Sequence, residues 1–266
     1  MSGSGNDFVF LDARGDQLAA KRCADPEFIT AVCAAHTGVG ADGIAVIAEA
    51  GGGQDFRLEY FNRDGSLGEL CGNASLCATR LSVELGAAKG TGLRFGTTAG
   101  VIQARIRDGE PEIDLQPPTD LRAEAGISRQ PGEDRMGFVN TGVPHLVIRT
   151  GSVETVPLQR RGPELRFHES LRAGANVNWV APAATGGVWA MRTYERGVEG
   201  ETLACGTGAV ACAVMLRTWG ESGDRTTLKT RSGRLLTVTL RDDGGVLRPS
   251  LRGEGRIVFE GSLREL

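Results

Sequence analysis

Lysine, histidine and paired cysteine motifs are scarce in this sequence. Of the 266 residues only Lys21, Lys89 and Lys229 are lysines, and none stands in the glycine-rich or apolar setting that a Schiff-base lysine needs. The three histidines are isolated and no Cys-x-x-Cys pair is present, so neighbouring residues provide no zinc ligand set. We therefore expect neither pyridoxal phosphate nor a metal, and predict that the protein works without a cofactor.

An excess of positive charge and a long hydrophobic run are also absent. The formal net charge is −3, whereas nucleic acids and anionic membranes usually bind a basic face. No apolar stretch approaches the roughly 20 residues of a membrane-spanning helix, and residues 1–6 have neither a basic region nor a hydrophobic segment. We expect a cytoplasmic protein that binds a small molecule, with no nucleic-acid or membrane partner.

The chain contains six cysteines but no secretory signal. We expect reduced thiols and no disulfide framework, because disulfides are rare in reducing compartments. Cys77 and Cys212 lie inside apolar segments and are predicted to be buried packing residues. The others are Cys23, Cys33, Cys71 and Cys205.

Two of these cysteines begin similar stretches. Residues 70–77 read Leu-Cys-Gly-Asn-Ala-Ser-Leu-Cys, and residues 203–212 read Leu-Ala-Cys-Gly-Thr-Gly-Ala-Val-Ala-Cys. A Cys-Gly turn that leads into a helix directs unpaired N–H groups and the positive end of the helix dipole at its surroundings, which favours anions and thiolate. Cys71 and Cys205 are therefore candidate catalytic thiols.

The two stretches belong to a longer internal repeat. Three pairs of landmarks are separated by the same 134 residues: Gly40 and Gly174, Tyr60 and Tyr194, and Cys71 and Cys205. A common offset close to half the chain indicates a duplicated domain. We expect two pseudo-symmetric lobes, each bringing one cysteine to a shared cleft.

The coarse pattern of segments predicts an α+β fold, in which each lobe consists mostly of strands around one apolar helix. The two Cys-Gly helices are expected to run to about Glu84 and Trp219. Pro117 and Pro118 suggest the lobe boundary, since a proline pair stiffens a connector and cannot lie inside a ladder. The predicted domains are residues 1–116, completed by the C-terminal segment 252–266 with a strand over residues 256–261, and residues 117–251.

Several motifs resemble the diaminopimelate epimerase family of cofactor-independent amino-acid epimerases and racemases. They span nearly the whole chain in the family's order: Gly5-Asn6-Asp7-Phe8-Val9, Phe61-Asn62-Arg63-Asp64-Gly65-Ser66, Glu69-Leu70-Cys71-Gly72-Asn73, Gly142-Val143-Pro144-His145, Asn176-Val177-Asn178-Trp179, and Tyr194-Glu195-Arg196-Gly197 through Cys205-Gly206-Thr207-Gly208. The resemblance implies two lobes, each a strand-wrapped central helix, with the substrate between them. It also implies a homodimer.

The resemblance further implies a reaction and a set of binding residues. One cysteine, as thiolate, removes the α-proton, and the other delivers a proton to the opposite face, so that L,L-diaminopimelate and meso-diaminopimelate interconvert for lysine and peptidoglycan synthesis. His145 and Glu195 match the family's groups beside the thiols. The implied substrate-binding residues are Asn6, Asn62, Gly72, Asn73, Asn176, Glu195, Arg196, Gly206 and Thr207.

Some of these assignments have simpler alternatives. Asn62 and Asn176 are also ordinary turn residues, and His145 after a proline fits a structural hydrogen bond as well as a site. The sequence departs from the family's usual residues at Ala74, Leu76 and Val143, which bears on the identity of the substrate.

Other functions share this pattern in part. One alternative is a related pyridoxal-phosphate-independent racemase for another amino acid, such as histidine. Another is an isomerase of the phenazine branch, which lacks the second Cys-Gly pair and so differs from this chain at Cys205. A small-molecule binding protein with inert thiols is the remaining possibility.

Overall fold

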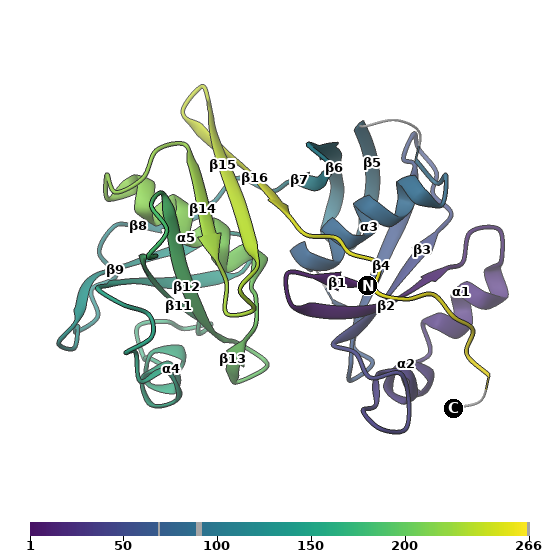
Figure 1. Ribbon diagram of the computed structural model, residues 1–266, viewed down its shortest axis with the longest axis horizontal. Helices are drawn as coiled ribbons and strands as arrows, with labels where there is room; N and C mark the ends of the chain where they lie inside the picture. The colour runs from purple at the N-terminus through teal and green to yellow at the C-terminus, as the bar shows by residue number, and fades with distance from the viewer. Residues whose placement is uncertain (69, 89–91, 265–266) are drawn as a thin grey trace. The chain divides into compact units, whose positions relative to one another are not determined.

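The computed structural model describes residues 1–68, 70–88 and 92–264 (Figure 1). The chain forms two compact units. The N-terminal unit contains Met1–Asp114 and the chain from Arg252 onward, and the C-terminal unit contains Leu115–Leu251. Glu69, which belongs to one of the motifs, and residues 265–266 of the predicted C-terminal segment lie outside the described residues.

The N-terminal unit has seven strands in sequential order in its sheet. Strands β2 and β3 pair in parallel, β3 and β4 antiparallel, β4 and β5 in parallel, and β5, β6 and β7 antiparallel. The strands are β1 Ser2–Gly3, β2 Asn6–Asp12, β3 Gly43–Ala48, β4 Phe56–Asn62, β5 Gly92–Thr97, β6 Gly100–Arg107 and β7 Glu110–Asp114; the helices are α1 Gln17–Cys23, α2 Pro26–Cys33 and α3 Gly72–Glu84.

The C-terminal unit repeats this pairing order. Strands β10 and β11 pair in parallel, β11 and β12 antiparallel, β12 and β14 in parallel, and β14 and β15 antiparallel. The elements are β8 Thr119–Arg122, β9 Glu133–Asn140, β10 Pro144–Thr150, α4 Leu158–Arg166, β11 Asn176–Pro182, β12 Val188–Glu195, β13 Gly200–Thr202, α5 Gly206–Thr218, β14 Arg225–Lys229, β15 Leu235–Asp243 and β16 Val246–Gly253.

Local sequence accounts for several of these elements. Strand β3 is an apolar run from Gly43 whose first five residues are all buried, as a strand covered on both faces requires. Helix α2 begins with Pro26 at its first turn, and the side chain of Asp25 caps it by accepting a hydrogen bond from the Glu27 N–H.

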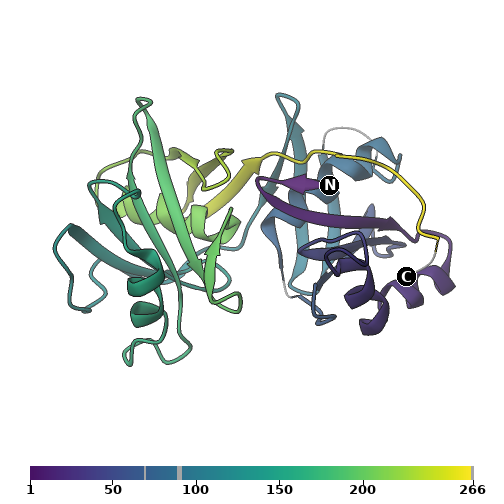
Figure 2. The same cartoon turned by 60° about the horizontal axis from the view of Figure 1, so that its bottom comes forward.

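Each unit is built around one buried helix. Nine of the 13 residues of α3 are buried, and the helix packs against β1, β3, β4, β6 and β7. Ten of the 13 residues of α5 are buried against β9, β10, β11, β14 and β15 (Figure 1, Figure 2). Gly206 follows Gly72 by 134 residues and Thr218 follows Glu84 by 134, so the predicted helices, the α+β class and the repeat are confirmed.

Other segments differ from the expectation. Helix α1 and strands β8 and β9 were not anticipated, and the strand predicted over residues 256–261 is wrong. Beyond β16 the described tail makes a single bridge, in which Arg256 and Ser2 exchange two backbone hydrogen bonds of 2.8 and 2.9 Å. The partner strand β1 is only two residues long, and so short an edge cannot extend the ladder.

Candidate functional site

Cys205 is the N-cap residue of α5. Its extended backbone (φ −134°, ψ 110°) turns the side chain back over the first helical turn, where Sγ accepts a hydrogen bond of 3.3 Å from the Gly208 N–H. A Cβ on Gly208 would lie 3.1 Å from this sulfur and 2.4 Å from Oδ1 of Asn178, so only glycine leaves room here. Cys205 is 7% exposed, so its side chain is largely enclosed.

Thr207 connects this sulfur to a buried histidine. Its Oγ1 lies 3.6 Å from Sγ of Cys205 and 3.0 Å from Nε2 of His145. The His145 ring is completely buried, and burial together with the nearby positive charge of Arg196 lowers its pKa to about 3. His145 is therefore a neutral ring at physiological pH, placed next to the predicted site.

Asn178 holds the other side of this ring. Its Nδ2 lies 3.0 Å from Nδ1 of His145, and its Oδ1 accepts a 2.9 Å hydrogen bond from the hydroxyl of Thr193. Asn178 lies in the motif of residues 176–179 but was not predicted to belong to the site. The sequence did contain an indication of this role. Asn178 follows Asn176 by two residues in an otherwise apolar strand, which places both side chains on one face of β11.

Asn176, Glu195 and Arg196 lie around the end of strand β12. The side-chain Oδ1 of Asn176 accepts a 2.9 Å hydrogen bond from the backbone N–H of Arg196. The Arg196 guanidinium donates to the carbonyl of Ala173 at 3.3 Å, and Oε2 of Glu195 accepts from the hydroxyl of Thr202 at 2.6 Å. Asn176 therefore has a structural task in this arrangement, since it positions the turn that carries Arg196.

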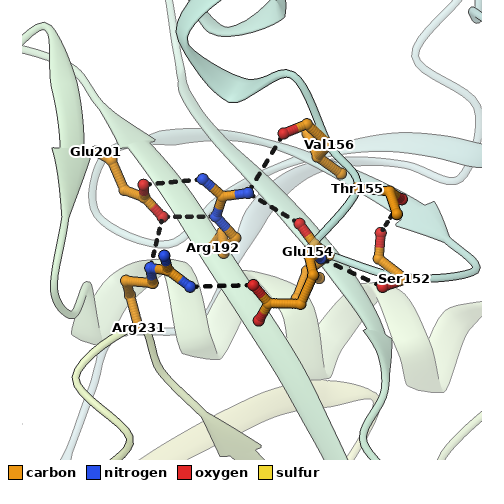
Figure 3. Close-up of polar contacts among 8 residues, drawn as sticks. Ser152, Glu154, Thr155, Val156, Arg192, Glu201 and Arg231 are labelled. Atoms are coloured by element: carbon orange, nitrogen blue, oxygen red, sulfur yellow. Dashed lines mark hydrogen bonds and ion pairs between the residues drawn. The ribbon is translucent and has the colours of Figure 1, made fainter.

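A cluster of ion pairs holds β13, the strand just before Cys205 (Figure 3). The Arg192 guanidinium pairs with both carboxylate oxygens of Glu201 at 2.6 and 2.9 Å and also donates to the carbonyls of Val153 and Val156. Arg231 lies 3.6 Å from the same carboxylate. This cluster ties the chain leading to Cys205 to the neighbouring strand β12.

Cys71 occupies the same position in the N-terminal unit. It is the N-cap residue of α3, and its Sγ accepts from the Ala74 N–H at 3.5 Å. Nδ2 of Asn73 donates to Oδ1 of Asn6 at 2.6 Å, and Nδ2 of Asn6 donates to Oδ2 of Asp42 at 2.9 Å. The structure thus brings Asn6 and Asn73 together beside the start of α3, with Asp42 as a partner that the sequence analysis missed.

Two acidic residues and Asn62 lie near this group. Burial and the neighbouring Asp42 carboxylate raise the pKa of Asp7. Asn62 ends strand β4 opposite Gly43, and its side-chain nitrogen donates to Oγ of Ser66 at 3.0 Å. This bond fits the role of a turn residue and does not test the predicted role of Asn62 in substrate binding.

The remaining cysteines are buried packing residues, as predicted for Cys77 and Cys212. Burial raises the pKa of Cys77 to about 12, raises that of Cys33 to about 11 and also raises that of Cys212. Within residues 1–68, 70–88 and 92–264, no group of three or more His, Cys, Asp or Glu side chains could hold a metal ion. None of the helices in this part of the chain has the length and hydrophobicity needed to span a membrane.

Two related α+β units, each built around one buried central helix, define a known class of fold. The structure superposes on a Bacillus anthracis protein of the phenazine-biosynthesis PhzF family with a TM-score of 0.72, covering 95% of this chain and 91% of that one. The two sequences are 15% identical, so this likeness concerns the fold.

Sequence comparison identifies the family within this class. Residues 1–119 and 137–254 match the family described as diaminopimelate epimerase. The chain is 49% identical to the diaminopimelate epimerase of Gemmatimonas aurantiaca, over 100% of this chain and 98% of that protein. It is 41% identical to that of Aquifex aeolicus, over 100% of this chain and 96% of the relative. The chain belongs to the diaminopimelate epimerase family.

Proposed function

We infer that this protein is an isomerase that interconverts L,L-diaminopimelate and meso-diaminopimelate. The inference is supported by family membership over both units and by relatives of this activity at 49% and 41% identity along the full chain. The structural observation that carries the mechanism is the placement of Cys71 and Cys205 as N-cap residues of the two equivalent helices.

In the proposed mechanism one cysteine is a thiolate and the other a thiol. The thiolate takes the α-proton of the substrate, and the thiol gives its proton to the opposite face of the same carbon, which inverts the configuration. The protonation states of the two sulfurs are exchanged at the end, so the protein is ready for the reverse reaction. No cofactor takes part in this proposal.

The N-terminus of each of these two helices supplies electrostatic stabilisation to the proposed reaction. The first N–H groups of an α-helix have no intrahelical acceptor, so those of Gly72, Asn73, Gly206 and Thr207 are available for the substrate α-carboxylate. Charge that develops on the substrate as the α-proton leaves is stabilised by such donors. Loss of one such donor in other enzymes costs roughly 3–4 kcal/mol.

The rest of the predicted site is proposed to select the substrate. Asn6, Asn62, Asn176 and Arg196 are assigned to its far amino and carboxylate groups, because a guanidinium and amide groups match these charges. Glu195 is assigned to the reacting end. Two of the departures from the family pattern, Ala74 and Leu76, are completely buried in α3, which favours a role for both in packing.

The cellular setting follows from the reaction. We propose that the protein serves lysine and peptidoglycan biosynthesis in the cytoplasm, as a homodimer without nucleic-acid or membrane partners. In this proposal the domains are the predicted lobes, residues 1–116 with 252–266 and residues 117–251. His145 supports the reaction from beside Cys205.

Proton NMR of L,L-diaminopimelate in D₂O tests the proposed function. The purified protein, with EDTA and without pyridoxal phosphate, is expected to exchange the α-hydrogen for deuterium and to form the meso isomer. Exchange with another amino acid but not with diaminopimelate would move the assignment to a related racemase. No exchange across an amino-acid panel, or activity that EDTA abolishes, would refute the proposal.

A further inference from the structure

Four side chains of the C-terminal unit form a continuous polar chain that ends at the sulfur of Cys205. The chain runs from Asn178 through His145 and Thr207 to Cys205, with successive contacts of 3.0, 3.0 and 3.6 Å. Asn178 and His145 are completely buried, so the proton positions in their contact are decided by protein groups and not by bulk water.

The orientation of the Asn178 amide follows from its other partners. Its Nδ2 lies 3.2 Å from the carbonyl oxygen of Leu146 and 3.4 Å from that of Asn176, and carbonyl oxygens only accept hydrogen bonds. Its Oδ1 accepts from the hydroxyl of Thr193. The group that faces Nδ1 of His145 is therefore an NH₂ donor.

This donor decides the tautomer of His145. A neutral imidazole has one N–H and one acceptor nitrogen, and Nδ1 must be the acceptor because it faces an NH₂ group. The ring proton therefore lies on Nε2, which donates to Oγ1 of Thr207. Since Thr207 accepts at its oxygen, its own hydroxyl hydrogen is available to donate to Sγ of Cys205.

We propose that Asn178 is a positioning residue that locks His145 as its Nε2–H tautomer, and thereby directs the hydroxyl hydrogen of Thr207 at the sulfur of Cys205. In this arrangement the sulfur receives two donors, the Thr207 hydroxyl and the Gly208 N–H, and both stabilise a thiolate more than a thiol. His145 serves as an orienting donor and not as a base. The importance of this arrangement for catalysis rests on the proposed role of Cys205.

The equivalent position in the N-terminal unit carries a different residue. The position equivalent to Thr207, 134 residues earlier, is Asn73, which has no hydroxyl and whose amide nitrogen donates to Asn6. The two candidate thiols therefore have different surroundings although their helices begin alike. The Thr207 hydroxyl therefore has no counterpart at position 73.

Arg196 acts on His145 as a positive charge, and burial together with the charge of Cys205 raises the pKa of the Cys212 thiol. Arg196 disfavours a second proton on the ring, which agrees with a His145 that keeps a single tautomer.

Nitrogen-15 NMR of the histidine side chains directly tests whether Asn178 fixes His145 as the Nε2–H tautomer. Only three histidines are present, and the signals of His145 are identified by their loss in His145→Gln. The wild-type ring is expected to show the Nε2–H tautomer without change from about pH 5.5 to 9. In Asn178→Asp the acceptor carboxylate replaces the NH₂ donor, so the ring proton should move to Nδ1. A wild-type Nδ1–H tautomer, or an imidazolium at pH 7, would overturn the proposal.

Alkylation of Cys205 by iodoacetamide, followed by peptide mass spectrometry over a range of pH, tests whether the Thr207 hydroxyl stabilises the Cys205 thiolate. Thr207→Val removes the hydroxyl with little change of shape, and the alkylation rate of Cys205 at pH 7 should fall about tenfold, the effect of one hydrogen bond to a charged group. Asn178→Leu should also lower the alkylation rate of Cys205. Thr207→Ser, which keeps the hydroxyl, should retain the wild-type alkylation profile. Thr226→Val removes another buried hydroxyl, bonded to Ser222, and should change nothing.

These measurements do not depend on turnover. If the protein does not epimerise diaminopimelate but shows the expected tautomer and alkylation pattern, the proposed function is refuted and the proposed role of Asn178 stands. An unchanged alkylation profile of Cys205 in a folded Thr207→Val protein would refute the proposed hydrogen bond from Thr207 to the sulfur, even if the enzyme epimerises diaminopimelate.

Discussion

Cys71 and Cys205 occupy equivalent places, but the atoms around the two sulfurs differ. Cys205 is 7% exposed, receives the Gly208 N–H at 3.3 Å and has the Thr207 hydroxyl at 3.6 Å. Cys71 is more exposed and receives the Ala74 N–H at 3.5 Å. A reaction that runs in both directions requires each sulfur to exist as thiol and as thiolate. Differences between the two therefore set which form each takes in the free enzyme.

Replacing either sulfur tests the two-cysteine assignment. Cys71→Ser and Cys205→Ser should each reduce epimerisation by roughly 10²–10⁴-fold, the usual contribution of one acid or base group, because a serine hydroxyl is a far weaker acid than a thiol. Turnover is measured by NMR, and the fold by circular dichroism. Cys23→Ser, at a buried thiol at the end of α1, is the control and should retain turnover. A rapid Cys71→Ser or Cys205→Ser enzyme would contradict the mechanism.

Gly208→Ala tests the tight packing at the start of α5. The new Cβ would lie 2.4 Å from Oδ1 of Asn178, so the amide and the Cys205 side chain must move. We expect a loss of about 1–3 kcal/mol in the free energy of unfolding, measured by urea titration, and a strong loss of turnover. The control Gly186→Ala has nothing within 4 Å and should change neither; an equally stable and active Gly208→Ala protein would show that this space is not needed.

At the scale of the elements, ion pairs replace hydrophobic packing in holding the short strand β13. Arg192 lies on β12 and Glu201 on β13, and their bidentate pair adds to a ladder of only three residue pairs. The hydrogen bonds from Arg192 lower the pKa of Glu201. Because β13 leads directly into Cys205, this pair also ties that segment to β12.

Arg192→Met should therefore weaken the C-terminal unit in a pH-dependent way. The loss should be about 1–3 kcal/mol at pH 7, since Glu201 and two carbonyls lose their donor. Because the folded chain lowers the pKa of Glu201, the pair contributes fully above the ordinary glutamate range and loses its contribution as the pH falls. The difference between variant and wild type in urea titrations should thus shrink from pH 7 to pH 4. Arg248→Met, at an exposed pair with Asp243, should show a difference under about 1 kcal/mol.

At the scale of the whole molecule, the proposed reaction requires both thiols to reach one carbon atom, although they belong to different units. Each unit has its own buried helix. In the proposed reaction both proton transfers occur on the α-carbon of the substrate.

Oxidation of the substrate-free protein tests this requirement. If the two sulfurs reach a common site, mild oxidant should form a disulfide between Cys71 and Cys205, which needs Cα atoms about 4.4–6.8 Å apart. Activity should be lost and then recovered with dithiothreitol, and peptide mapping should identify the pair. Substrate present during oxidation should slow the inactivation. Persistent activity in oxidant, or a loss that dithiothreitol does not reverse, would count against the shared site.

The sequence by itself determined the features that depend on local pattern and on repetition. The Cys-Gly pairs predicted both central helices, including the end of α3 at Glu84, because an apolar run after a capping residue is a local signal. The offset of 134 residues predicted the duplication, and the motifs predicted the family. The terminal strand over residues 256–261 failed because a strand depends on its partner, and β1 is too short to provide one.

Only the tertiary structure decided which polar atoms meet. Asn178 and His145 lie 33 residues apart, and their contact exists because β10 and β11 pair in parallel with His145 opposite Asn176. Asp42 reaches Asn6 in the same way, through the parallel pairing of β3 and β2. Strand register and burial select these partners, and both arise from packing between distant segments. The proton positions on His145 and Thr207 therefore follow from the fold.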